Sequence, residues 1–308
     1  MRGWTRWAAG LAVVLAIVGV SAGCGSGDSA SSRPTIVVTT PMLGSLVSDL
    51  VGDQAEVKVL MPNGADPHEY QPSAKDVAAL GSADLVVENG LKLEEGLQDA
   101  LDQARGDGVP FFTATDHVTL RRFAADESDE IAEHGPEDPH IWTSPIAMRE
   151  MVAGLAPAVQ KQLGIDVAAR ATDLEEQLTA LDGQITKELA PIPADRRKLV
   201  TGHESLGYFA QRYNFEVIGA LIPSLSSQAQ VSASNLAALR QQVEAEKVPA
   251  IFNEAGTPAG VANAIADETG VPVIEIATHN LPDDGSYFTF MRDMAAAVNR
   301  GLDPPASG

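Results

Sequence analysis

From Pro34 onward, short runs of β-branched and apolar residues alternate with longer amphipathic stretches, and this alternation constrains the fold more than any other feature. Strands connected by helical crossovers form parallel pairs, so the pattern predicts layered α/β units. The expected strands of the first half are Thr35–Thr39, Glu56–Leu60, Leu85–Glu88 and a short run near Phe111, and the expected helices are Pro41–Val51, Ser73–Leu80, Leu93–Arg105 and one that opens at Ser144-Pro145. These elements predict a first lobe built on a parallel sheet.

A long helical stretch interrupts the alternation. Leu174, Leu178 and Leu181 recur at helical spacing within Asp166–Leu189, which has no glycine before Gly183. At 1.5 Å per residue, a helix of this length runs about 35 Å, the width of a small domain. After it the expected strands are Lys198–Thr201, Val217–Ala220, Ala250–Asn253 and Val273–Ile276, with helices at Leu206–Tyr213, Ser234–Glu246 and Pro258–Thr269. We therefore predict two parallel-sheet α/β lobes bridged by one long rigid helix.

The N-terminus has the pattern of an export signal. Arg2 and Arg6 precede an apolar stretch from Ala8 to Val20, which is too short to span a membrane. Cys24, the single cysteine of the chain, follows a short run of small residues. The segment resembles a bacterial lipoprotein signal, in which this cysteine carries the lipid, although Ser21 stands where an aliphatic residue is usual. An ordinary secretory signal is the alternative, and both place the protein outside the cytoplasm.

These features divide the chain into five expected segments. They are a signal peptide at 1–23, a flexible Gly/Ser-rich tether at 24–34, an N-terminal lobe at 35–165, a connecting helix at 166–190 and a C-terminal lobe at 191–303. The tether composition is typical of a flexible linker between an anchor and a folded body.

The charge of the chain limits its partners. It has 42 acidic and 21 basic residues, and removal of the signal takes away two arginines, which leaves a net charge of about −23. Such a charge repels nucleic acid and anionic substrates and attracts cations. With one cysteine, the chain forms no intramolecular disulfide, and any metal site needs histidine or carboxylate ligands.

Four histidines fall where a binding site is expected. His68 and His140 each follow an Asp-Pro pair, and His203 and His279 each follow a predicted strand. In open α/β sheets, ligands bind beyond the carboxyl ends of the strands. Neutral imidazole binds zinc at about 2.0–2.1 Å in a tetrahedral shell. The four histidines are therefore candidate metal ligands, and a structural or surface role for each is the alternative.

An acidic loop precedes His140. Asp126–Asp138 contains seven carboxylates together with His134. We expect either a solvated charged loop or a segment that captures cations weakly and transiently beside the site.

These features together resemble the zinc/manganese solute-binding lipoproteins of bacterial metal ABC importers, of the cluster A-I type. The resemblance is carried by the lipoprotein-type signal, Gly64–Pro72, Asp138–Trp142, Thr201-Gly202-His203 through Tyr208-Phe209, the long central helix and the tail Thr278–Met291. It implies two α/β lobes bridged by a rigid helix. It also implies a metal in the interlobe cleft, held by four side chains, two from each lobe.

By position, the resemblance places the first three ligands on His68, His140 and His203, the last of which lies five residues before Tyr208. Zinc binders of the family are similar to this chain in having histidine at the third position, whereas manganese binders usually have glutamate. The resemblance therefore indicates the zinc-binding branch.

The fourth position departs from the family pattern. An aspartate usually follows a strand-end threonine there, but Thr278 is followed by His279. Asp283, Asp284 or a water molecule are the alternatives to His279 as fourth ligand. Imidazole suits Zn²⁺ and Cu²⁺, while Mn²⁺ favours carboxylate and water.

The resemblance implies an extracytoplasmic, monomeric zinc-binding protein without catalytic residues. Anchored to the cell membrane by a lipid on Cys24, it would capture Zn²⁺ and deliver it to the permease of an ABC importer. One alternative is manganese or another divalent metal in the same type of importer. Another is a zinc-dependent hydrolase with Glu69 or Glu204 as general base, which would need an open coordination position. A lipoprotein with a structural metal is the third.

Overall fold

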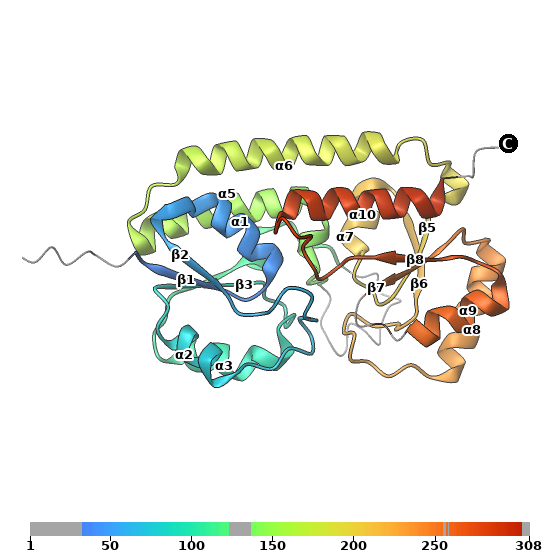
Figure 1. Cartoon of the computed structure of the whole chain (residues 1–308), viewed down its shortest axis with the longest axis horizontal. Helices are drawn as coiled ribbons and strands as arrows, with labels where there is room; N and C mark the ends of the chain where they lie inside the picture. The colour runs from blue at the N-terminus through green and yellow to red at the C-terminus, as the bar shows by residue number, and fades with distance from the viewer. Residues whose placement is uncertain (1–32, 123–136, 255–256, 258, 304–308) are drawn as a thin grey trace, which may run out of the picture. The chain divides into compact units, whose positions relative to one another are not determined.

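The computed structural model describes residues 33–303 apart from 123–136, 255–256 and 258. These residues form two four-stranded parallel sheets (Figure 1). The first sheet has the order β2-β1-β3-β4, with β1 at Thr35–Val38, β2 at Glu56–Val59, β3 at Leu85–Glu88 and β4 at Phe111–Thr113. The second has the order β6-β5-β7-β8, with β5 at Lys198–Thr201, β6 at Glu216–Ala220, β7 at Ile251–Glu254 and β8 at Val273–Ile276. The predicted fold class, two parallel-sheet α/β lobes, is confirmed.

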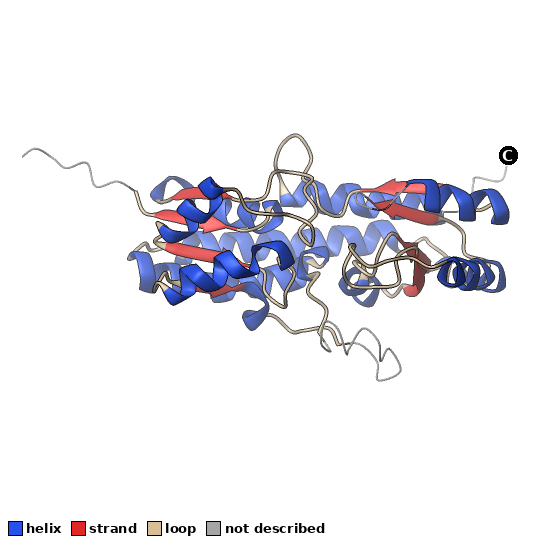
Figure 2. Cartoon of the chain, turned by 90° about the horizontal axis from the view of Figure 1, so that it is seen from below, coloured by secondary structure: helices blue, strands red, loops and turns tan. Residues whose placement is uncertain are grey.

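Helices flank the strands of each sheet (Figure 2). They are α1 (Pro41–Val51), α2 (Ala74–Gly81), α3 (Gln98–Gly106), α5 (Pro145–Leu163), α6 (Ala168–Leu189), α7 (Gly207–Tyr213), α8 (Ala233–Glu246), α9 (Ala259–Thr269) and α10 (Tyr287–Leu302). Among the described residues, no helix has both the length and the apolar character that a membrane crossing requires.

The helix starts follow from local chemistry. Ser144 accepts a hydrogen bond from the amide of Ala147 at the start of α5, and Pro145 occupies the first turn, where its missing amide hydrogen is not needed. Thr40 and Pro41 play the same parts at α1. These two starts orient the segments that lead out of β1 and out of the His140 turn.

Helix α6 packs against α1, α5 and α10 and so runs along both lobes (Figure 1). Its buried residues include Leu174, Leu178 and Leu181, as the heptad-like spacing predicts. They belong to one hydrophobic cluster that extends from Ile36 in the first sheet to Phe252 in the second. The long helix therefore contributes to a hydrophobic core that both lobes share.

One predicted helix start was wrong, and one helix was not predicted. The helix expected from Leu93 begins only at Gln98, because Glu94 has a non-helical ψ angle of 56° and Glu95–Leu97 form a 3₁₀ turn. The tail after Thr278 contains an unpredicted helix, α10, whose first amides are capped by the hydroxyl of Ser286.

The expected signal peptide and Cys24 lie outside the described residues, as does nearly all of the tether. The limits of the five segments remain predictions.

Candidate metal centre

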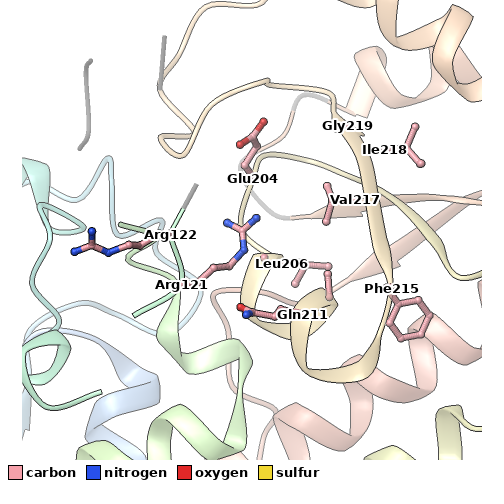
Figure 3. Close-up of a pocket in the computed structure, with 11 residues that line it drawn as sticks. Arg121, Arg122, Glu204, Leu206, Gln211, Phe215, Val217, Ile218 and Gly219 are labelled. Atoms are coloured by element: carbon pink, nitrogen blue, oxygen red, sulfur yellow. The ribbon is translucent and has the colours of Figure 1, made fainter. Parts of the chain in front are cut away.

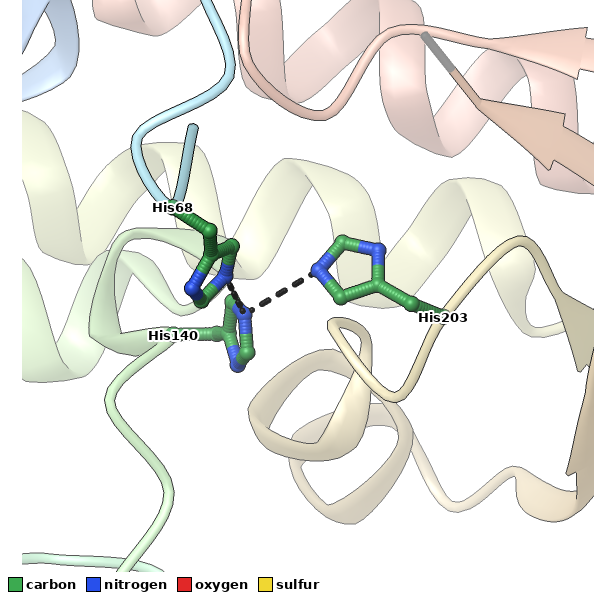
Figure 4. A group of neighbouring side chains, drawn as sticks. All are labelled: His68, His140 and His203. Carbon is green, nitrogen blue, oxygen red and sulfur yellow. Dashed lines mark hydrogen bonds between the residues drawn. The ribbon is translucent and has the colours of Figure 1, made fainter. Parts of the chain in front are cut away.

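The four candidate histidines lie together, each beyond the end of a strand or on a loop that faces one. Figure 4 shows His68, His140 and His203. His203 follows β5 and His279 follows β8, while His68 lies on the loop after β2 and His140 precedes α5. Their exposed fractions are 2% for His68, 0% for His140 and 1% for the other two. The centroid of the His203 ring lies 5.6, 5.1 and 5.4 Å from those of His68, His140 and His279. The structure brings the four side chains together around His203, in two overlapping groups, His68–His140–His203 and His203–Glu254–His279. Their role as metal ligands stays a prediction.

Three ring nitrogens converge on one point. Nε2 of His140 lies 3.3 Å from Nε2 of His68 and 3.2 Å from Nε2 of His203 (Figure 4). Two imidazoles bound at 2.0–2.1 Å in a tetrahedral shell have nitrogens about 3.3 Å apart. The observed spacing matches two edges of such a shell.

A carboxylate orients each of these rings from behind. Nδ1 of His140 lies 2.8 Å from Asp138, Nδ1 of His203 lies 3.1 Å from Glu254, and Nδ1 of His68 lies 3.3 Å from Glu95. In the neutral tautomer that suits these partners, Nδ1–H donates to the carboxylate and Nε2 keeps its lone pair. Three lone pairs that face one another in a buried space repel unless a cation lies between them. The arrangement is therefore suited to a cation.

His279 supplies a fourth imidazole beside His203. Its Nδ1 lies 3.4 Å from the hydroxyl of Thr278, and its Nε2 is buried without a hydrogen-bond partner among the described residues. A buried polar atom of this kind is rare unless it binds something. Nε2 of His279 is thus available to the cluster.

The two aspartates that follow His279 lie elsewhere. Asp283 and Asp284 are exposed. Asp284 accepts hydrogen bonds from the amide of Ser286 at 3.0 Å and the hydroxyl of Thr289 at 2.7 Å, which ties it to the start of α10. Its carboxylate therefore serves the helix cap.

Glu254 is a site residue that the sequence analysis missed. It accepts the amide of His203 at 2.8 Å and the hydroxyls of Ser205 at 2.9 Å and Thr278 at 2.6 Å. Burial alone raises the pKa of such a carboxyl, but His203 and its hydrogen bond outweigh burial, so the pKa of Glu254 lies well below its usual value. A signal was present, because Glu254 ends β7 just as the histidines follow β5 and β8.

Asp138 corrects the expectation for the acidic loop. Most of Asp126–Asp138, including His134, lies outside the described residues, but Asp138 is fully buried rather than solvated. Its Oδ1 accepts the amide of His140 at 2.9 Å as well as the ring hydrogen, and Nη1 of Arg121 lies 3.3 Å from Oδ2. Burial raises the pKa of Asp138 to about 6.

The protonation of the imidazoles differs within the cluster. Burial and the neighbouring His203 lower the pKa of His140 well below its usual value. Burial and His203 likewise lower the pKa of His279 to about 4. For His203, burial acts to lower the pKa, but the Glu254 carboxylate outweighs it and the pKa is raised. The cluster thus keeps at least two rings neutral at neutral pH.

The two carboxylates considered as general bases do not share the histidine cluster. Glu69 is exposed. Glu204 lines a separate cavity of about 420 Å³ with Arg121, Arg122 and Gln211, and none of the four histidines lines it (Figure 3).

Comparison with known proteins decides the family. Residues 36–301 match the family model described as "Zinc-uptake complex component A periplasmic", or ZnuA. The chain belongs to this family. The resemblance to the metal-binding components of ABC importers is thereby confirmed.

The relatives of this ZnuA-family protein are named for different metals, some for zinc and some for manganese. It is 31% identical over 259 residues to the zinc-binding protein TroA of Treponema pallidum, which covers 82% of this chain and 80% of TroA. It is 26% identical over 316 residues to the manganese ABC transporter substrate-binding lipoprotein scaA of Streptococcus gordonii, covering 94% and 96%. The solved structure of the periplasmic zinc-binding protein TroA matches with a TM-score of 0.80 and 27% identity, over 89% of this chain and 100% of that one.

Membership fixes the general role. Proteins of this family are the solute-binding components of metal ABC importers, which work with a membrane permease and an ATPase, and the family is not a catalytic one. Which metal this ZnuA-family member carries is a separate matter that depends on its own ligands.

Proposed function

We propose that this protein captures Zn²⁺ outside the cytoplasm through His68, His140, His203 and His279 and passes it to the permease of its ABC importer. The observation that carries the proposal is the convergence of three Nε2 atoms at 3.2–3.3 Å, each ring oriented by a carboxylate. Outer carboxylates of this kind fix the tautomer and strengthen the ligand.

Zinc is favoured over manganese because imidazoles and not carboxylates face the centre. Both oxygens of Glu254 already accept hydrogen bonds from Ser205, Thr278 and His203. Mn²⁺ favours carboxylate and water ligands, whereas imidazole suits zinc. Cu²⁺ also binds imidazole but favours a tetragonal arrangement, whereas the two nitrogen–nitrogen distances of 3.3 and 3.2 Å match tetrahedral spacing.

The number of proposed ligands supports zinc transport and not catalysis. Four imidazoles complete a tetrahedral shell, whereas a catalytic zinc keeps one position for water. The buried position of all four rings also leaves little room for a substrate.

The anchor and assembly state are part of the proposal. The lipoprotein-type sequence before Cys24, and the description of scaA as a lipoprotein, support a lipid anchor on the outer side of the cell membrane. We propose that the anchored protein acts as a monomer.

Competitive titration of the metal-free protein with Zn²⁺, Mn²⁺ and Cu²⁺ tests the function. Zinc should bind tightly and Mn²⁺ should not displace it, and Ala substitution of His68, His140 or His203 should weaken zinc binding strongly without unfolding the protein. His117→Ala is the matched control, because His117 is exposed and stacks on Phe112, with ring centroids 4.4 Å apart. Preference for Mn²⁺, or wild-type affinity in one of the three variants, would contradict the assignment.

A further inference from the structure

The loop that carries His68 is fastened from the second lobe by two side chains. The hydroxyl of Ser227 donates to Oδ2 of Asp66 at 2.6 Å, and the amide group of Gln228 donates to the backbone carbonyl of His68. Oδ1 of Asp66 in turn accepts the backbone amide of His68 at 3.0 Å. We call Ser227 and Gln228, with these bonds, the clasp. Both backbone polar groups of His68 are thus tied, directly or through Asp66, to the clasp.

The clasp is itself held in shape. It lies between β6 and α8, where the amide of Ser226 donates to the hydroxyl of Ser224 at 3.2 Å and the amide of Gln228 donates to the hydroxyl of Ser226 at 3.3 Å. Ser227 is 8% exposed, so its bond to Asp66 is shielded from water, while Gln228 is on the exposed side. A buried hydrogen bond to a carboxylate is stronger than one in water.

The corresponding groups of His140 and His203 are held within their own lobes. The carbonyl of His140 accepts the hydroxyl of Thr143 at 3.1 Å, and the carbonyl of His203 accepts the hydroxyl of Thr201 at 2.6 Å. An opening of the cleft would therefore leave these two rings in place on their lobes, while it would break the clasp and free His68.

We propose that Ser227 and Gln228 are positioning residues that hold His68 against the ion, and that breaking the clasp is the step that frees zinc for the permease. The inference rests on the proposed function, since it needs His68 to be a zinc ligand. All four imidazoles are buried, so the ion leaves only when one of the segments that carry them moves. Other hydrogen bonds also cross between the lobes, such as those of Trp142 to the carbonyl of Thr278 and of Asn63 to Leu281. Among His68, His140 and His203, however, only His68 has a backbone carbonyl that accepts a side-chain hydrogen bond from the opposite lobe within the described residues.

Zinc dissociation from the full-length protein tests the clasp. The zinc-loaded wild type and the Ser227→Ala, Gln228→Ala and double variants are mixed with excess chelator, and the dissociation rate is followed. Each lost hydrogen bond should speed dissociation by about 2- to 10-fold, and the double variant by about 4- to 100-fold. The association rate should change little. Gln228→Glu keeps the shape but loses the donor and should act like the Ala variant, whereas Ser227→Thr keeps the hydroxyl and should behave as wild type.

The controls separate positioning from general stability. Ser48→Ala and Gln177→Ala remove the same groups from exposed helical positions and should leave the rate unchanged. In a His68→Ala background, Ser227→Ala should have no further effect on zinc dissociation, because the clasp acts through His68.

The outcomes are distinguishable. A wild type that fails to bind zinc overturns the proposed function. A wild type that binds zinc, with a double variant that releases it at the wild-type rate, overturns the clasp alone. An equal effect of Ser227→Ala with and without His68 also overturns it, since that result is the signature of a merely structural role.

Discussion

Zinc affinity should fall as the pH is lowered from about 7 to about 5, by no more than about 100-fold per pH unit. Protons and zinc compete for the same lone pairs, and each ligand that titrates contributes at most about tenfold per unit. Four ordinary imidazoles, with pKa values of about 6.5, would give a limit of about 10⁴-fold per unit. In this structure two of the four imidazoles stay neutral between pH 7 and 5 and do not contribute to this limit. Burial and His203 hold the pKa of His140 well below its usual value and lower the pKa of His279 to about 4.

At most two ligands therefore take up protons in this range, and His203 is one of them. Burial acts to lower its pKa, but Glu254 raises it, so proton competition at this ring begins at a higher pH than for a free imidazole. Competition titrations against a zinc indicator at several pH values, at constant ionic strength, give the slope of log affinity against pH. A slope between one and two supports the reasoning. The His279→Ala variant should bind zinc more weakly but show the same slope of log affinity against pH. A slope near four would refute the protonation pattern of the buried cluster.

Three further predictions concern single residues. Glu254→Gln should weaken zinc binding by about 10- to 100-fold because the ring of His203 loses its charged partner, and an unchanged zinc titration would mean that the carboxylate serves only the fold. His279→Ala should weaken zinc binding far more than Asp284→Ala, while His279→Asp should retain zinc and raise manganese binding in the same competition assay. The reverse ranking of the two Ala variants would make Asp284 the fourth ligand. Cys24→Ser should release the protein from membranes in a fractionation experiment, and persistent association of the variant would exclude the lipid anchor.

The histidine cluster could be predicted from the sequence because its geometry follows from strand ends and short motifs. His203 and His279 end strands of one sheet, and two Asp-Pro-His motifs mark the loops that face them. Glu254 obeys the same strand-end rule, since it directly follows the predicted strand Ala250–Asn253, but it has no motif of its own.

The outer carboxylates were harder to predict because sequence shows charge density and not orientation. Asp138 was recognised only as the last member of an acidic loop, yet it is buried against His140. Glu95 lies 27 residues from His68, and its position depends on the positive φ angles at Leu91 and Lys92, which have no signal in residue type. Such partners are set by tertiary packing.

Helix α6 also determines how the molecule holds together as a folding unit. Its buried leucines share one apolar cluster with Ile36 of the first sheet and Phe252 of the second. Neither lobe can keep that surface covered without the helix, and the helix has no apolar partner without the lobes. The protein should therefore melt in a single cooperative transition, and a polypeptide cut after residue 165 or before residue 191 would expose core surface instead of yielding a stable half. Recombination between relatives should for the same reason succeed when α1, α5, α6 and α10 are exchanged as a set.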